Sequence, residues 1–298
     1  MTDFLKNLSD DLASTVEAAG ASIVRVEGRR RQSATGVVWS ADGMIITTHH
    51  VVERDDNIRV GLPNGDVTSA ALVGRDPTTD LALLRVQANG LTPASWAADD
   101  EMRVGHLVVA IGRPERTLQA TLGIVSALDE AWRTSAGGTI DRYVQTDVVM
   151  YPGFSGGPLV SAAGPFYGIN SSALARGVSV TIPSVTLRRV TEMLLTHGRV
   201  RRGYLGVSAQ PVRLPSAMAQ HLEQETGLLV MSVEPDSPSD KGGLTLGDTI
   251  VGVAGARVRH MDDLMGQLGG DAVGKAVPVK VLRGGQIAEL TVTIGERK

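Results

Sequence analysis

A serine set between glycines, in Gly153-Phe154-Ser155-Gly156-Gly157, is the stretch of this sequence best suited to covalent chemistry. Glycine lets the backbone bend sharply, so Ser155 can expose its hydroxyl as a nucleophile. The backbone N–H groups of Gly153, Phe154 and Ser155 can then surround a developing oxyanion. The same string fits the Gly-x-Ser-x-Gly nucleophile elbow of α/β-hydrolases, so the motif alone leaves two folds open.

Two residues upstream could activate this serine. A serine hydroxyl becomes nucleophilic when a histidine accepts its proton, and a carboxylate holds the histidine in place. His50 follows an apolar run over 44–48, and Asp80 stands in a polar turn before the apolar run 81–86. The order His50, Asp80, Ser155 is that of chymotrypsin-like proteases, whereas an elbow hydrolase has its acid and histidine after the serine. The residues after Ser155 also read as a strand rather than a helix, which favours the chymotrypsin-like class.

Short apolar strands separated by turns must position these three side chains. Between residues 36 and 86 such strands alternate with turns at 41–43, 62–65 and 76–77, after a first strand at 22–27. A second set is predicted at 107–112, 121–128, 142–146, 157–160, 166–170 and 178–182. This spacing predicts a mainly β fold with two six-stranded barrels. We expect His50 and Asp80 from the first barrel and Ser155 from the second, with the site in the cleft between them.

Apolar residues at helical spacing predict one helix at 4–18 and another at 184–197. Ser184 is expected as the N-cap of the second helix, and Gly198 is expected to end it.

Several motifs follow one another in a fixed order. They are Thr47-Thr48-His49-His50-Val51-Val52, Thr79-Asp80-Leu81-Ala82-Leu83-Leu84, Gly123-Ile124-Val125-Ser126-Ala127, Gln145-Thr146-Asp147 and Gly153 to Leu159. Together these motifs resemble the protease domain of the HtrA (DegP-, DegQ- and DegS-like) serine proteases, and the resemblance runs from about residue 10 to the end of the chain. Where the family usually has Asn, this sequence has His49 and Phe154, and Ala34-Thr35-Gly36 replaces a Gly-Ser-Gly.

The resemblance implies a protease domain over 1–198, a charged linker over 199–202 and one PDZ domain over 203–298. Tyr204, Leu205 and Gly206 look like the loop whose N–H groups bind a peptide carboxylate, and the next strand would accept the peptide by β-augmentation. A strand at 227–233 and a groove-lining helix at 261–268 fit the same pattern. An ordinary turn at 204–206 is the alternative interpretation.

Specificity is predicted from Val149, six positions before Ser155, where chymotrypsin-like folds place the floor of the pocket for the residue before the scissile bond. An apolar floor offers a Lys or Arg side chain no charge partner, so small or medium aliphatic side chains should be preferred. Ile169, Asn170 and Ser171 are expected to form the pocket wall and the edge strand for the substrate backbone. Plain core packing is the alternative for Val149.

The composition narrows the range of partners. The 298 residues carry a net charge of −3, and the short Arg29-Arg30-Arg31 cluster reads as a solvated loop, so no nucleic acid is expected. The sequence contains no cysteine, and we expect neither a metal nor a cofactor. No apolar run is long enough to span a membrane, and residues 1–11 lack the core of a signal peptide. We expect a periplasmic or envelope location if a leader was removed, and a cytoplasmic one otherwise.

Two functions are compatible with these residues and motifs. The first is a serine endopeptidase that degrades misfolded or unfolded proteins, with a PDZ domain that binds substrate C-termini. The second is a non-proteolytic chaperone or peptide-binding scaffold. The resemblance further implies a homotrimer or a multiple of trimers, with Phe4 either a trimer contact or part of a helix capping the barrel. It also implies that the polar segment Ala127 to Gln145 transmits peptide binding to the oxyanion loop, whereas simple tethering of substrate is the alternative.

Overall fold

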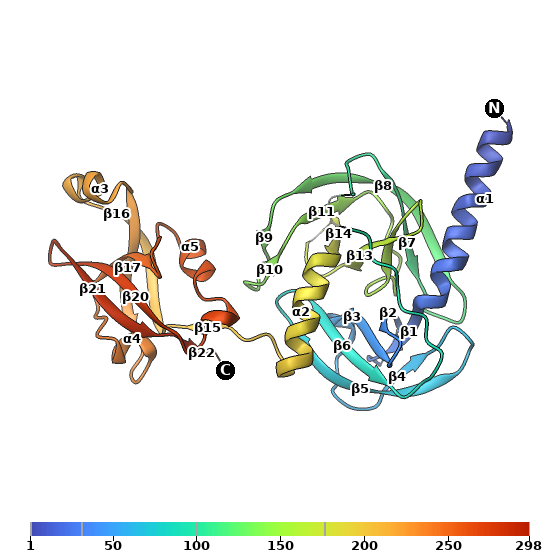
Figure 1. Cartoon of the computed structure of the whole chain (residues 1–298), viewed down its shortest axis with the longest axis horizontal. Helices are drawn as coiled ribbons and strands as arrows, with labels where there is room; N and C mark the ends of the chain where they lie inside the picture. The colour runs from blue at the N-terminus through green and yellow to red at the C-terminus, as the bar shows by residue number, and fades with distance from the viewer. Residues whose placement is uncertain (1, 31, 99–100, 176, 298) are drawn as a thin grey trace. The chain divides into compact units, whose positions relative to one another are not determined.

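The computed structural model describes residues 2–30, 32–98, 101–175 and 177–297, and it divides into two compact units, Met1–Val200 and Arg201–Lys298 (Figure 1). Arg31 of the basic cluster lies outside the described residues. Within the described ranges, no helix combines the length and the apolar character that a membrane crossing requires.

The first barrel of the N-terminal unit is closed and has six strands in the order β1-β2-β3-β6-β5-β4. Its side chains alternate between the two faces of each strand, so that Val24, Val26 and Ile45 pack in the barrel interior. The strands are β1 (Ile23–Glu27), β2 (Ala34–Ser40), β3 (Met44–Thr48), β4 (Ile58–Gly61), β5 (Val67–Asp76) and β6 (Leu81–Val86).

A second closed barrel of six strands follows in the order β11-β14-β13-β12-β7-β8, so the predicted double barrel is confirmed. Val108, Val144 and Leu159 pack in its interior. A separate two-stranded ribbon, β9 (Trp132–Arg133) with β10 (Thr139–Ile140), extends from the barrel between β8 and β11. The barrel strands are β7 (Leu107–Gly112), β8 (Gln119–Asp129), β11 (Tyr143–Thr146), β12 (Pro158–Ser161), β13 (Phe166–Ser171) and β14 (Ser179–Pro183).

Two helices flank the barrels in this unit. Helix α1 (Thr2–Ala19) packs Leu12 and Val16 on the core through its second half, continues into the short turn η1 (Gly20–Ser22), and leaves Phe4 exposed at its free end (Figure 1). Helix α2 (Ser184–His197) has the predicted bounds and ends at Gly198, whose φ is 69°.

The predicted capping role of Ser184 is wrong. Pro183 occupies the N-cap position with an extended backbone, and helix α2 begins one residue later at Ser184. The Ser184 hydroxyl instead donates to the carbonyl of Ala97 at 3.2 Å. It therefore ties the helix start to the loop before the second barrel.

The C-terminal unit contains a sheet with the path β16-β17-β18-β20-β21, and β19 pairs with β18. Helix α5 packs beside β16, which is an edge strand of this sheet. The helix ends at Gly266 and not at Leu268 as predicted. The strands are β15 (Gly203–Tyr204), β16 (Val207–Arg213), β17 (Thr226–Val233), β18 (Thr249–Val253), β19 (Ala256–Arg257), β20 (Ala276–Arg283), β21 (Gln286–Thr293) and β22 (Gly295–Glu296). The helices are α3 (Ser216–Leu222), α4 (Pro238–Lys241), α5 (Met261–Gly266) and η3 (Gly270–Ala272).

Candidate active site

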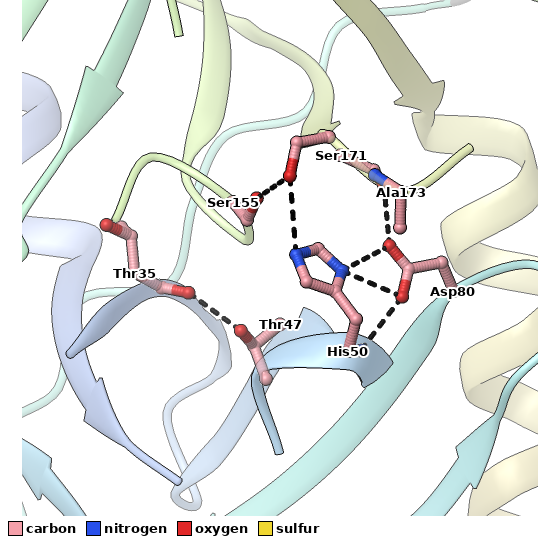
Figure 2. A network of polar contacts seen from close by, with 8 residues as sticks. Thr35, Thr47, His50, Asp80, Ser155, Ser171 and Ala173 are labelled. Carbon is pink, nitrogen blue, oxygen red and sulfur yellow. Dashed lines mark hydrogen bonds and ion pairs between the residues drawn. The ribbon is translucent and has the colours of Figure 1, made fainter. Parts of the chain in front are cut away.

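Two paired strands of the first barrel bring His50 and Asp80 together. β3 pairs with β6 so that Thr48 lies opposite Leu81, and the residues just beyond these positions meet at one end of the barrel. His50 lies in the short turn η2 (His49–Val51), and its backbone N–H donates to Asp80 Oδ1 at 2.9 Å. Its ring Nδ1 lies 3.0 and 2.8 Å from the two carboxylate oxygens of Asp80 (Figure 2). This geometry assigns the ring proton to Nδ1 and leaves a lone pair on Nε2.

Asp80 is almost fully buried and has a left-handed backbone, with a φ of 57°. Few residues with a side chain adopt this conformation, and neighbouring contacts must hold it. The Asp80 carbonyl accepts from the N–H of His49 at 3.0 Å, and the Ser171 hydroxyl donates to Asp80 Oδ2 at 2.5 Å. Because Ser171 ends β13, the second barrel helps to fix a carboxylate that belongs to the first.

Ser155 lies in the loop between β11 and β12, and Thr35 of the first barrel holds this loop. The N–H of Thr35 donates to the Ser155 carbonyl at 3.2 Å, and its hydroxyl donates to the Gly153 carbonyl at 2.7 Å. Thr47 in turn donates its hydroxyl to the Thr35 carbonyl at 2.7 Å (Figure 2). These roles of Thr35 and Thr47 were not predicted from the sequence. Thr47 belongs to the motif that contains His50, and Thr35 to a stretch where the sequence departs from the family, but neither was assigned a contact with the serine loop.

The hydrogen-bond partner of the Ser155 hydroxyl is another serine rather than the histidine. Its Oγ lies 3.0 Å from Ser172 Oγ, which lies 3.5 Å from His50 Nε2. Among the described residues, no hydrogen bond joins Ser155 directly to His50. The structure thus brings the three predicted residues into one site and places the Ser172 hydroxyl between two of them.

The residues before Ser155 form a type II turn. The N–H of Phe154 donates to the Tyr151 carbonyl at 3.0 Å, Pro152 is the second residue, and Gly153 is the third with a φ of 94°. A proline followed by a glycine with positive φ is the signature of this turn. Since the Phe154 N–H is already bonded, its predicted role as an oxyanion donor is wrong. The N–H groups of Gly153 and Ser155 donate to no other described residue.

The Phe154 side chain anchors this turn. The ring is fully buried, and it lies edge-on to the Tyr151 ring with 5.8 Å between the ring centroids. A Cβ built on Gly112 would come within 2.6 Å of the Phe154 ring, so the aromatic side chain fills the space beside β7. At position 154 this chain therefore has a large apolar side chain, where the family resemblance led us to expect the polar Asn.

The predicted pocket residues separate into two groups. Val149 is 56% exposed, which contradicts the core-packing alternative, and its carbonyl accepts from Thr121 Oγ1 at 2.9 Å. Ile169 and Asn170 are fully buried, so their prediction as pocket-wall side chains is wrong. Ile169 packs in the core, and Asn170 uses its amide on Pro158 and Thr181.

Strand β13 also cannot offer Ile169 and Asn170 as a free edge, because it pairs with β12 on one side and β14 on the other. Strand β13 has an unpaired side only near Ser171, because its pairing with β12 has ended there.

His49, which precedes the paired histidine, is half-buried. Burial, with the nearby Arg75 guanidinium, lowers the pKa of His49. This side chain is therefore uncharged at neutral pH and adds no positive charge beside His50.

In the C-terminal unit, the predicted carboxylate-binding loop connects β15 to β16. Leu205 is buried in the core of this unit, and its carbonyl accepts from Ser239 N–H at 2.9 Å. The Gly206 carbonyl accepts from the N–H of Glu234 at 2.8 Å. Tyr204 donates its hydroxyl to the Glu234 carboxylate, and this hydrogen bond raises the pKa of Tyr204. The loop is thus held through its carbonyls.

The comparisons with known proteins agree with this architecture. A family model described as a trypsin-like peptidase domain matches residues 34–169, and one described as a PDZ domain matches residues 203–294. Two closed barrels and a PDZ domain define the class as a trypsin-like serine protease with a C-terminal PDZ domain. Solved structures include the HtrA-type protease AlgW with a decapeptide (30% identity, TM-score 0.79) and the serine endoprotease from Yersinia pestis (32% identity, TM-score 0.79). Each comparison covers 96% of this chain and 99% or 98% of the other.

The chain therefore belongs to the HtrA family of serine proteases. Curated relatives named "Probable periplasmic serine endoprotease DegP-like" come from Ectopseudomonas mendocina (39% identical over 277 residues) and Chlamydia trachomatis (35% identical over 277 residues). These matches cover 90% and 91% of this chain. They cover 58% and 55% of the relatives, so the chain spans little more than half of their length.

Proposed function

We propose that the chain is a serine endopeptidase that cleaves unfolded or misfolded proteins. Ser155 Oγ attacks the carbonyl carbon of a peptide bond while His50 Nε2 takes the hydroxyl proton. The imidazolium then gives this proton to the leaving amine, and an acyl group stays on Ser155 until water releases it. The observation that carries the proposal is the contact of His50 Nδ1 with Asp80, in a site that also contains Ser155.

The type II turn supports an oxyanion hole made by two donors. In such a turn the N–H of Gly153 is not used by the turn itself, and the Ser155 N–H is equally unused within the described residues. Two preorganised donors aimed at the developing O⁻ stabilise the tetrahedral intermediate because they need no reorganisation. We assign Gly153 and Ser155 to this role.

The test is cleavage of casein and of a short chromogenic peptide by purified full-length variants. Ser155→Ala and His50→Ala should each lower kcat by about 10⁶, because the two residues act as a unit. Asp80→Ala should lower it by about 10⁴. Ser69→Ala, at an exposed position of β5, serves as the matched control and should leave kcat unchanged. Cleavage by Ser155→Ala at a comparable rate would reject the nucleophile.

The non-proteolytic alternative is not favoured by the family assignment. A chaperone would keep its effect on an aggregating protein in Ser155→Ala and show no turnover in the unaltered chain. Mass spectrometry of the products distinguishes the two functions, since only a protease creates new termini.

For the C-terminal unit, we propose that it binds the C-terminus of a peptide or substrate protein. The edge strand β16 has one unpaired side, and the preceding loop is held through the carbonyls of Leu205 and Gly206. An extended peptide could add to β16 beside helix α5, with its carboxylate at the N–H groups of Tyr204 to Gly206. In calorimetry, a peptide with an apolar free C-terminus should bind. The same peptide with an amidated C-terminus should bind far more weakly.

Assembly and location complete the proposal. The exposed Phe4 on the free end of α1 supports a trimer or a multiple of trimers, and sedimentation of the full chain tests this assembly. The relatives named periplasmic support a periplasmic location, which cell fractionation tests.

A further inference from the structure

The hydroxyl of Ser172 lies between the nucleophile and its base. It is 3.0 Å from Ser155 Oγ and 3.5 Å from His50 Nε2. Because His50 uses Nδ1 on Asp80, its Nε2 has one lone pair and accepts one hydrogen bond. Ser155 and Ser172 therefore compete for the same acceptor, and Ser155 donates to His50 only when Ser172 is elsewhere.

The position of Ser172 is built into the site rather than left to a loose loop. The preceding residue, Ser171, is buried and donates its hydroxyl to Asp80 Oδ2 at 2.5 Å. The N–H of the following residue, Ala173, donates to Ser171 Oγ at 3.1 Å. The Ser171 hydroxyl, bound to the carboxylate that orients His50, thus holds the backbone on both sides of Ser172.

A proton relay through Ser172 would use the same contacts, but the distances do not favour it. Proton transfer to a base needs heavy atoms about 2.6–3.2 Å apart. The contact between the two serines is within this range, whereas the contact of Ser172 with His50 is longer. The shorter of the two contacts holds Ser155 Oγ at Ser172 and not at His50.

We propose that Ser172 is a positioning residue that holds the Ser155 hydroxyl in a resting orientation, from which it must turn to reach His50. The proposal rests on the proposed function, since it needs Ser155 to be the nucleophile. Removing the Ser172 hydroxyl frees Ser155 for His50 and should accelerate attack. The rate of attack should rise about two- to tenfold, which corresponds to the net free energy of one hydrogen bond from a hydroxyl.

The test is the second-order rate of inactivation by diisopropyl fluorophosphate, a compact reagent that needs no side-chain pocket and no PDZ ligand. In this reaction an Oγ–P bond forms on Ser155, the P–F bond breaks, fluoride leaves and His50 takes the hydroxyl proton. Ser172→Ala should react faster than the unaltered chain. Ser172→Thr restores a hydroxyl and should return the rate to near the original. Ser172 is exposed, so both variants should fold, and Ser69→Ala is the matched control.

A second readout uses a chromogenic peptide. Ser172→Ala should raise kcat with little change in KM, because the contact affects the nucleophile and not the substrate. An unchanged or slower inactivation rate in Ser172→Ala overturns the inference, and so does a Thr variant as fast as the Ala variant. If diisopropyl fluorophosphate fails to label Ser155 in the unaltered chain, both this inference and the proposed function are wrong. If the reagent labels Ser155 but Ser172→Ala reacts no faster than the unaltered chain, only this inference is wrong and the proposed function stands.

Discussion

The sharpest test of the oxyanion assignment is Gly153→Ala. Gly153 has a φ of 94°, which disfavours any residue with a Cβ by about 1–2 kcal/mol. A Cβ at this position would also lie 2.5 Å from Pro114 Cβ and 3.0 Å from the Ser33 carbonyl oxygen. The least costly relief is a flip of the peptide between Pro152 and Gly153, which converts the type II turn to type I. The flip turns the N–H of residue 153 away from the oxyanion.

The magnitude follows from the loss of one donor. Removal of one oxyanion-hole hydrogen bond lowers kcat by about 10²–10³. We expect this loss in Gly153→Ala, with KM nearly unchanged and a fall in unfolding free energy of only about 1–2 kcal/mol. The assay measures kcat and KM on a chromogenic peptide, with urea unfolding of the same preparations.

The matched control is Gly164→Ala. Gly164 lies in the turn between β12 and β13 with a φ of 110°. Apart from its two chain neighbours, no described residue has an atom within 4 Å of a Cβ built there. This variant carries similar backbone strain in the same barrel without reaching the site, so its kcat should not change. If Gly153→Ala keeps its kcat within about threefold of the control, the N–H of residue 153 is not an oxyanion donor and the reasoning fails.

Three further predictions concern other parts of the chain. Phe154→Ala empties a fully buried site and should lower the unfolding free energy by about 3–5 kcal/mol in urea titrations; a smaller loss than about 1 kcal/mol would mean that the ring does not anchor the turn. Peptides with Val, Ala or Leu before the scissile bond should be cleaved far better than those with Lys or Arg because Val149 is apolar, and a basic cleavage profile in mass spectrometry would reject this pocket. Burial is the largest single effect on the pKa of Asp248 and raises it, but the hydrogen bonds from Arg283 and Thr245 together with the Arg283 charge lower it below its ordinary 3.8. Its stabilisation should therefore be complete above pH 3.8 and be lost as the pH falls through the lowered value, and Asp248→Asn should flatten this part of the acid unfolding curve measured by circular dichroism.

Much of the fold could be predicted because each strand can be recognised from its own local sequence pattern. The predicted strand 107–112 has the bounds of β7, and the predicted helix 184–197 has the bounds of α2. Apolar alternation and turn residues are local properties, so they can be recognised without knowing the partner strands. The order of His50, Asp80 and Ser155 selected the double barrel over the hydrolase elbow, because each class presents its side chains in a fixed chain order.

The errors lie where a residue's role depends on packing across the barrels. Strand β13 has a partner on both sides near Ile169, which the one-dimensional pattern of apolar residues cannot reveal. The Phe154 N–H is used by its own turn, and the hydroxyl of Ser184 faces the loop at Ala97 rather than its own helix. Ser172 had no signal in the sequence, since the second of two adjacent serines is ordinary until the fold places it beside Ser155.

The contacts of the segment between β8 and β11 bear on how activity could be regulated. Thr134 donates its hydroxyl to the Thr78 carbonyl at 2.6 Å, and a Cβ on Gly138 would lie 2.4 Å from the same oxygen. Thr78 belongs to the turn that Asp76 stabilises and that leads into the left-handed Asp80. This segment therefore contacts the backbone of the turn that precedes Asp80. Its predicted action on the oxyanion loop stays a prediction. A ligand can act through the segment only if it binds differently to states with and without this contact. Breaking the contact would remove one support of the turn before Asp80, so we expect regulation by this route to act on the Asp80–His50 pair.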